Sequence, residues 1–354
     1  MVTTNMKTLS LALAGLLLGS ATVAMAQQKI NAAGATFPAA IYQKWFEEFH
    51  KLHPDVEINY QSIGSGGGIA QLTGGTVDFG ASDMPMTDDQ LSKLKVRAFH
   101  FPTVLGAVVP TYNIPGVVAD LKFSPETLAA IFLGTITKWN DPRLVKDNPG
   151  ITLPKDDIVV VHRSDGSGTS FVWTDYLSKV SPEWKSKVGA NTSVSWPVGL
   201  GGRGNEGVAG LVKQTPDSIG YVELFWAAQN KVTIGLVKNS SGVFVKADVE
   251  SVTEAAAGAA KDMPADFRIS ITNAPGKKAF PISSFTYLLI PSQIPDAAKS
   301  KAIVAFLQWM LADGQKYAAG LYYAPLPKEV VAKEIKQIAQ INAPGAQAGQ
   351  PKKK

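Results

Sequence analysis

Three short stretches of the sequence combine glycine with Ser or Thr where a helix is expected to begin: residues 34–38 (GATFP), 63–68 (IGSGGG) and 163–170 (RSDGSGTS). A helix N-terminus offers unpaired backbone N–H groups and about half a positive charge, and both attract an oxyanion. Glycine lets the backbone approach a ligand closely, while Ser and Thr add hydroxyl donors. One such stretch usually forms only a helix cap. Three of them predict an anion-binding site.

Two charged groups accompany these stretches. Arg163 follows a β-branched run at residues 158–161, and an arginine at a strand end can bind an anion through two parallel hydrogen bonds. Asp165 is close enough in the chain to hold its guanidinium in place. Asp83 is less expected, because a carboxylate repels an anion unless the ligand carries a proton that the carboxylate accepts. Asp83 could equally cap the turn after a strand, and the sequence leaves both interpretations open.

Two motifs that suggest other functions lack the context they need. Residues 199–204 match G-x-G-x-x-G, but Trp196 and Pro197 interrupt the preceding strand, and no ribose-binding acid follows about 20 residues later. We therefore expect a glycine-rich surface loop beside the ligand cleft, with Asn205 capping the next helix. Ser167 lacks the G-x-S-x-G elbow of a serine nucleophile. His162 is the nearest base in the sequence, but as the neighbour of Arg163 on a strand it should point to the opposite face.

The elements that position these residues alternate between short β-like runs and amphipathic helical stretches, which is typical of an α/β fold. A helix is predicted to open at Pro38, with Ile41, Trp45 and Phe49 recurring four apart on its buried face. The run at 158–161 is typical of a parallel strand covered on both faces, and ligands bind at the carboxyl ends of such strands. Further strands are expected at 57–62, 76–82, 105–109, 219–222 and 287–290, and further helices at 297–317 and 328–341.

The N-terminal residues and the composition suggest an exported protein. Residues 1–26 have a basic start at Lys7, a short apolar run and an A-x-A sequence at 24–26, which predicts a signal peptide. The chain has no cysteine, so we expect no lipid anchor, no disulfide and no Cys-ligated metal. The net charge is +5, but three of the lysines lie at 352–354, which leaves the folded body near neutral and argues against nucleic-acid binding. These features favour the bacterial periplasm.

The sequence resembles the substrate-binding protein of ABC-type phosphate importers. The resemblance is carried by residues 34–38, 77–83 (VDFGASD), 163–170, 196–202 (WPVGLGG) and 219–223 (IGYVE). It implies an α/β, type II-like periplasmic-binding-protein fold of two lobes joined by two crossovers that form a hinge. The expected division is a signal peptide at 1–26, the first lobe at 27–103 and 281–341, the second lobe at 104–280, and a disordered tail at 342–354.

The resemblance also implies the site and the partners. Phosphate would be contacted from the first lobe by Thr36, Phe37 (through its backbone N–H), Ser65 and Asp83, and from the second by Arg163, Ser167, Gly168 and Thr169, with Asp165 orienting Arg163. A monomer that uses no cofactor would deliver phosphate to a membrane permease driven by a cytoplasmic ATPase. The alternatives are a binding protein for another oxyanion such as sulfate, which has no proton for Asp83, and a secreted phosphatase or serine hydrolase.

Overall fold

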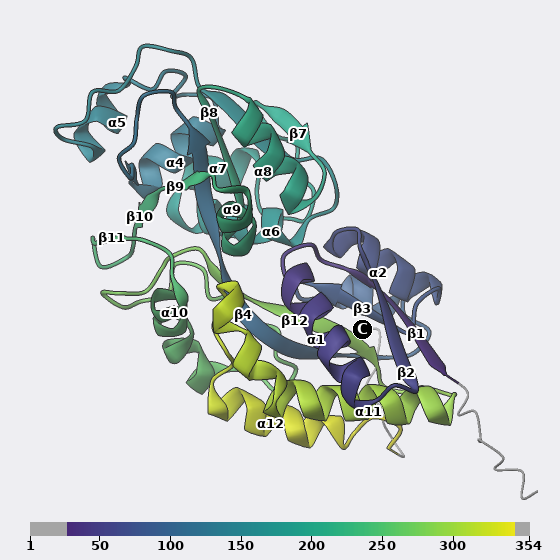
Figure 1. The fold of residues 1–354 in the computed structure, drawn as a ribbon. Coiled ribbons are helices and arrows are strands. Elements are labelled where there is room, and N and C mark those ends of the chain that lie inside the picture. Colours follow the sequence, from purple (N-terminus) through teal and green to yellow (C-terminus); the bar gives the residue numbers. More distant parts are fainter. Residues whose placement is uncertain (1–26, 344–354) are drawn as a thin grey trace, which may run out of the picture.

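The computed structural model describes residues 27–343, apart from the side chains of 259–261, and consists of two lobes with one long strand running through both (Figure 1). That strand is β4 (Ala98–Asn113). The predicted signal peptide at 1–26 lies outside the described residues. Within residues 27–343, no helix is both long and apolar enough to cross a membrane.

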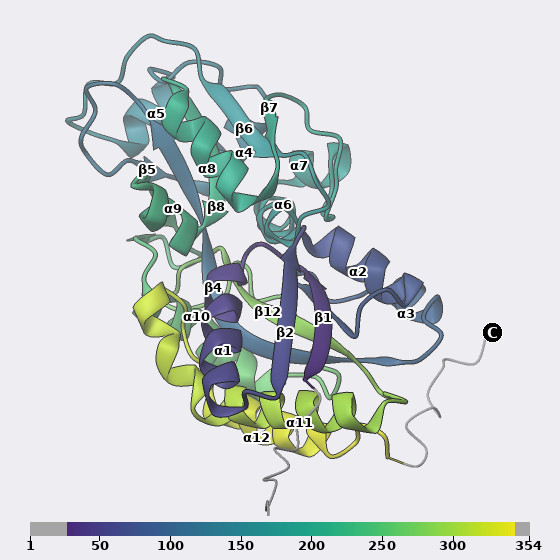
Figure 2. The same ribbon diagram turned by 45° about the vertical axis from the view of Figure 1, so that its right-hand side comes forward.

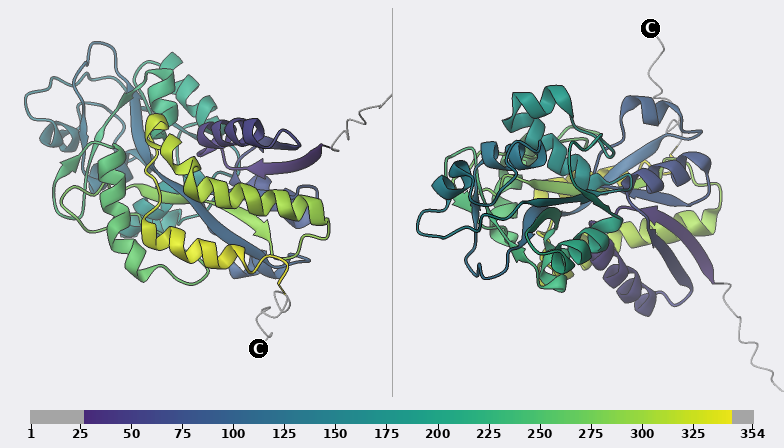
Figure 3. Two further views of the ribbon diagram at one scale, coloured as in Figure 1. Left: turned by 60° about the horizontal axis from the view of Figure 1, so that its bottom comes forward. Right: turned by 90° about the horizontal axis from the view of Figure 1, so that it is seen from above.

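The first lobe is built around a mixed sheet. β1 (Gln28–Gly34) lies between β2 (Val56–Ser62) and β3 (Phe79–Ser82) and is parallel to both, and β12 (Ser283–Pro291) is antiparallel to β3. α1 (Ala39–Leu52) buries the predicted face, and Phe49 packs against Phe306 of α11 (Ala297–Ala312) with ring centroids 5.4 Å apart. α11 and α12 (Lys328–Ile338) lie side by side on the side of this lobe that faces away from the second lobe (Figure 3).

β4 belongs to both lobes. Its residues 98–107 pair antiparallel with β12, and its residues 108–113 pair antiparallel with β8 (Ser218–Glu223) of the second lobe. A single strand therefore carries the chain from one lobe to the other, and Figure 2 shows it running up into the second lobe.

The second lobe places a parallel three-strand arrangement beside β4. β6 (Val159–Arg163) is parallel to both β8 and β7 (Leu200–Gly202). α6 (Gly168–Val180) and α8 (Gly204–Gln214) pack on these strands, and Trp173 stacks on Tyr221 with centroids 5.0 Å apart. The second lobe also contains several shorter elements: α4 (Pro125–Phe132), α5 (Pro142–Asp147), α7 (Pro182–Lys187), α9 (Leu224–Asn230), β5 (Lys122–Phe123), β9 (Thr233–Ile234), β10 (Leu236–Lys238) and β11 (Phe244–Val245). The first lobe contains two more helices, α2 (Ser65–Gly74) and α3 (Asp88–Ser92).

Several expected boundaries differ from the structure. α11 ends at Ala312 rather than 317, because the chain tightens into a 3₁₀ turn at Gly314–Tyr317, where Gly314 O accepts a hydrogen bond of 2.7 Å from Trp45 Nε1. The glycine-rich loop is interrupted by β7, and α8 begins at Gly204, so Asn205 is not its cap.

Two segments also pack differently from the expected division into lobes. α10 (Val249–Asp262) contacts β12 and α12 of the first lobe, whereas the expected boundary at 280 would place it in the second. Asn342 was expected to open a disordered tail, but its Nδ2 donates to Ser300 Oγ over 2.7 Å and its Oδ1 accepts from Ile294 N. Residues 344–354 of that predicted tail lie outside the described residues.

Candidate functional site

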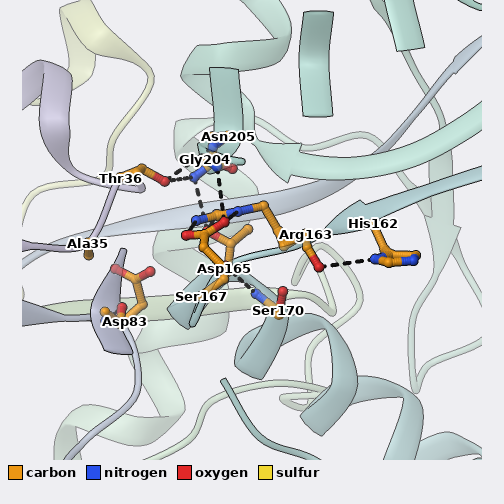
Figure 4. Close-up of polar contacts among 12 residues, drawn as sticks. Ala35, Thr36, Asp83, His162, Arg163, Asp165, Ser167, Ser170, Gly204 and Asn205 are labelled. Atoms are coloured by element: carbon orange, nitrogen blue, oxygen red, sulfur yellow. Dashed lines mark hydrogen bonds and ion pairs between the residues drawn. The ribbon is translucent and has the colours of Figure 1, made fainter. Parts of the chain in front are cut away.

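The predicted site residues converge between the two lobes, at the ends of strands and helices, and Figure 4 shows Thr36, Asp83, Arg163 and Ser167 among them. Thr36 and Phe37 form the turn between β1 and α1, and Ser65 is the first residue of α2. Asp83 directly follows β3, and Arg163 ends β6. Ser167 caps α6, whose first two residues are Gly168 and Thr169. The three glycine–hydroxyl stretches thus form helix starts, as their sequences predict, and all three meet at the same place.

The lobes touch each other around this site. Gly66 N of the first lobe donates to Gly166 O of the second over 2.8 Å, and Trp226 Nε1 donates to Thr36 O over 3.0 Å. Gly64 precedes α2 with a positive φ of +89°, and a side-chain carbon there would lie 2.7 Å from Gly166 O. A glycine is required at this position for both reasons. The structure therefore holds the lobes in a closed arrangement.

Asp165 holds the Arg163 guanidinium in one orientation. Arg163 Nε donates to Asp165 Oδ1 over 2.8 Å, and Nη2 donates to Oδ2 over 2.5 Å. Gly204 N donates to Oδ1 over 3.0 Å as well. Burial alone would raise the pKa of the Asp165 carboxyl, but the hydrogen bonds and charge of Arg163 lower it overall, so Asp165 stays ionised. The buried guanidinium is fixed, and its Nη1 faces Thr169 Oγ1 at 3.4 Å.

Asp83 is buried, with 1 % of its surface exposed. Its Oδ1 accepts a hydrogen bond of 2.8 Å from Thr286 Oγ1, and its backbone N–H donates to Ser65 Oγ over 3.1 Å. Oδ2 has no hydrogen-bond partner among the described residues. Burial raises the pKa of this carboxyl to about 7, although the Thr286 hydrogen bond and the Arg163 charge oppose the shift. These contacts favour an acceptor for a ligand proton over a turn cap, because neither oxygen receives a backbone N–H within residues 27–343.

The hydroxyls of Thr36 and Ser167 are also buried, and each accepts a hydrogen bond from a backbone N–H, that of Thr36 from Asn205 N over 3.2 Å. Ser167 Oγ accepts from Ser170 N over 3.0 Å, as an N-cap does. The turn at Phe37 is held by Tyr323, whose Oη donates to Phe37 O over 2.7 Å.

His162 lies on the other side of its strand. Its ring stacks on Trp196 with centroids 4.8 Å apart and planes at 11°, and it points away from the Arg163 guanidinium (Figure 4). The predicted opposite orientation is confirmed, so His162 is not a base for Ser167. The described part of the chain contains no cluster of three or more His, Cys, Asp or Glu that could hold a metal ion.

A cavity of about 310 Å³ lies elsewhere in the second lobe. It is lined mainly by apolar residues of the α4–β6–β7 region, including Ile131, Ile158 and Leu200, and by none of the predicted site residues. Its lining has no charged group with which to bind an anion.

Sequence reasoning missed two polar residues of the site. Asn205 was interpreted as a helix cap, but its side chain bonds Thr36 and Thr169. Thr286 lies in the middle of β12, where nothing in the alternating apolar pattern distinguishes it from a packed strand residue. For Asn205 the one available signal was its place directly after the glycine-rich stretch. For Thr286 the sequence carries no signal.

The protein thus has two α/β lobes, and hydroxyl, guanidinium and backbone donors from both lobes surround the buried Asp83 carboxyl between them. A family model described as a PBP superfamily domain matches residues 19–314. The phosphate-binding protein PstS of Xylella fastidiosa (strain Temecula1) is 47 % identical over 304 residues, covering 86 % of this chain and 83 % of that protein. The PstS protein of Pasteurella multocida is 45 % identical, covering 86 % and 88 %. The chain belongs to the PBP superfamily and, within it, to the PstS family of phosphate-binding proteins.

Solved structures show the same fold at lower identity. A high-affinity periplasmic phosphate-binding protein solved with bound phosphate aligns with a TM-score of 0.69 at 20 % identity, covering 87 % of this chain and 93 % of the other. A phosphate ABC transporter substrate-binding protein from Clostridium perfringens aligns with a TM-score of 0.63 at 17 % identity, covering 85 % and 100 %. The predicted two-lobed, type II-like α/β fold is confirmed.

Proposed function

We propose that this protein binds inorganic phosphate between its lobes in the periplasm and delivers it to the membrane permease of an ABC importer. The observation that carries the proposal is the combination of one buried acceptor with many donors. Arg163, the hydroxyls of Thr36, Ser65, Ser167 and Thr169, and the N–H groups at the start of α6 supply donors, and Asp83 Oδ2 supplies an acceptor. An anion that also carries a proton matches both kinds of group.

Phosphate fits this pattern better than sulfate. At neutral pH inorganic phosphate retains at least one proton, which can be donated to Asp83, whereas sulfate has none and would place its oxygens against the carboxylate. Arg163 is already paired with Asp165, so the site attracts the anion more by directed hydrogen bonds than by excess positive charge. The relatives named phosphate-binding proteins support the same ligand.

The proposed mechanism is closure of a hinge. The expected ligand contacts come from both lobes, so a bound anion stabilises the closed form through contacts that the open form lacks. The chain would cross between the lobes within β4 and again between β11 and α10. A signal peptide at 1–26 would direct export, and a monomer would suffice for this mechanism. Small-angle scattering should give a smaller radius with phosphate than without, and identical curves at saturating phosphate would exclude a hinge.

Calorimetric titration tests the ligand. Phosphate should bind at one site per chain with high affinity, and sulfate should bind far more weakly under the same conditions. Equal affinities would indicate a general oxyanion-binding protein instead.

An enzymatic role is tested separately. A chromogenic phosphate ester should not be turned over, because Ser167 Oγ makes no hydrogen bond to a His, Asp or Glu side chain among the described residues. Steady hydrolysis that Ser167→Ala abolishes would replace the binding proposal with a hydrolase.

A further inference from the structure

We propose that Asn205 is a positioning residue, which forces one threonine hydroxyl from each lobe to donate its hydrogen to the bound anion. The inference rests on the proposed phosphate site and assigns a role to a residue outside the expected contact set.

Asn205 bridges the two lobes at the site. It lies in the first turn of α8 and its side chain is fully buried. Its Nδ2 donates to Thr36 Oγ1 of the first lobe over 2.7 Å and to Thr169 Oγ1 of the second lobe over 3.0 Å. One amide nitrogen therefore connects two of the predicted contact residues, which are separated by more than a hundred positions in the sequence.

The orientation of the amide is determined by its other end. Oδ1 accepts a hydrogen bond of 2.9 Å from Glu223 N. A backbone N–H can only donate, so the atom facing it must be the amide oxygen and not the nitrogen. The nitrogen then has to face the two threonines, with one hydrogen for each.

The consequence concerns the hydrogens of the two hydroxyls. A hydroxyl has two acceptor lone pairs and one hydrogen. Thr36 Oγ1 also accepts from Asn205 N over 3.2 Å, and Thr169 Oγ1 also faces Arg163 Nη1 at 3.4 Å. Each oxygen thus receives two N–H groups, which occupy its lone pairs. Each hydroxyl can then act toward a ligand only as a donor.

This arrangement exists only when the lobes are closed. Thr36 reaches Asn205 across the cleft, so opening the lobes removes both of its N–H partners and frees its hydroxyl to rotate. Asn205 therefore couples closure to the donor character of the site. Its loss should weaken phosphate binding through these hydroxyls and leave the fold of each lobe intact.

A double-mutant cycle tests the coupling. Asn205→Ala alone should weaken phosphate binding about tenfold, and Thr36→Val alone should weaken it by a similar factor. In the Thr36→Val background, Asn205→Ala should add about threefold or less, because only the Thr169 hydroxyl is left for it to orient. If the two losses of affinity multiply in the double variant, and also in the corresponding cycle of Asn205→Ala with Thr169→Val, the proposal is overturned.

Asn205→Asp is the second variant. It keeps the shape of Asn205 but offers two acceptors, so the threonine hydroxyls would turn toward the carboxylate, and phosphate affinity should fall about 100-fold or more. Affinity equal to wild type would also overturn the proposal. If Asn205→Ala does not fold, the cycle is run with Asn205→Asp.

Asn148→Ala is the matched control. Asn148 is another buried asparagine of the second lobe, whose Nδ2 donates to Lys122 O and Leu144 O. This variant should change the unfolding temperature without changing phosphate affinity. Failure of the wild-type protein to bind phosphate would refute the proposed function, whereas binding by wild type with multiplicative losses would refute only the role of Asn205.

Discussion

Gly168 of the second lobe lies directly against Asp83 of the first. A side-chain carbon on Gly168 would stand 2.7 Å from Cβ of Asp83 and would also overlap Asp83 Oδ2 and Ser65 Oγ. Real side-chain carbons do not approach that closely. The lobes can therefore meet at the site only because position 168 lacks a side chain.

Gly168→Ala should therefore prevent full closure. Alanine is a better helix former than glycine, so α6 and its lobe should remain folded, while phosphate affinity should fall about 100-fold or more. Calorimetry would measure the loss of phosphate affinity, and small-angle scattering would measure the incomplete closure. Gly210→Ala is the control, because Gly210 lies on α8 of the same lobe with open space around it. Wild-type affinity in Gly168→Ala would show that the lobes need not approach this closely to bind.

Arg163→Ala should remove the charged donor of the site. Each hydrogen bond to a charged group contributes roughly 1.5–3 kcal/mol, so loss of a bidentate pair should weaken phosphate binding about 100-fold or more. Arg143→Ala is a close control, because Arg143 makes the same two-bond pair with Asp141 on the exposed surface. Titration calorimetry should give wild-type affinity for the control. If the phosphate affinity of Arg163→Ala lies within about threefold of wild type, Arg163 is not a ligand contact.

The selectivity for phosphate over sulfate should depend on pH through Asp83. Its pKa is raised to about 7 by burial, so below that pH the carboxyl is protonated and can donate to sulfate, and above it the negative charge repels sulfate. The phosphate-to-sulfate affinity ratio should therefore rise between about pH 5.5 and about pH 8.5.

Asp83→Asn should abolish that dependence. The amide donates at every pH, so the ratio should become flat and, at about pH 8.5, about 100-fold lower or more than in wild type. Asp78→Asn is the control, because Asp78 pairs with Lys299 outside the site. If the folded Asp83→Asn variant keeps the wild-type phosphate-to-sulfate affinity ratio, Asp83 has only a structural role.

Glu334 should make the protein less stable in alkali. It is fully buried on α12, neither carboxyl oxygen has a hydrogen-bond partner among the described residues, and burial raises its pKa well above the usual value. As pH rises, the Glu334 carboxyl loses its proton in the unfolded chain before it does so in the folded protein. The free energy of unfolding that is present below about pH 4 is therefore lost progressively as pH rises toward the folded-state pKa.

Glu334→Gln removes the titrating group. At about pH 9 the free energy of unfolding in urea should be about 1–3 kcal/mol higher than in wild type, with the difference shrinking at about pH 5. Glu329→Gln, on the exposed side of the same helix, should leave the pH profile unchanged. Parallel profiles for wild type and Glu334→Gln would exclude Glu334 as the source of the pH dependence.

The sequence by itself determined the local parts of the site. Ser167 caps α6, Ser65 opens α2, and Arg163 ends a β-branched strand, because caps, glycine turns and strand periodicity depend on neighbours within a few positions. Asp165 was predicted to hold Arg163 for the same reason, since only two positions separate them.

Only the tertiary structure decided which of these parts face each other. Asn205 meets Thr36 across 169 positions, and Thr286 meets Asp83 across 203. A hydrogen bond between such distant residues leaves no periodic or compositional trace near either of them, and the side chain that it needs looks in the sequence like an ordinary cap or strand residue. The same holds for α10, because its contacts with β12 and α12 of the first lobe leave no trace in the residues of the helix itself.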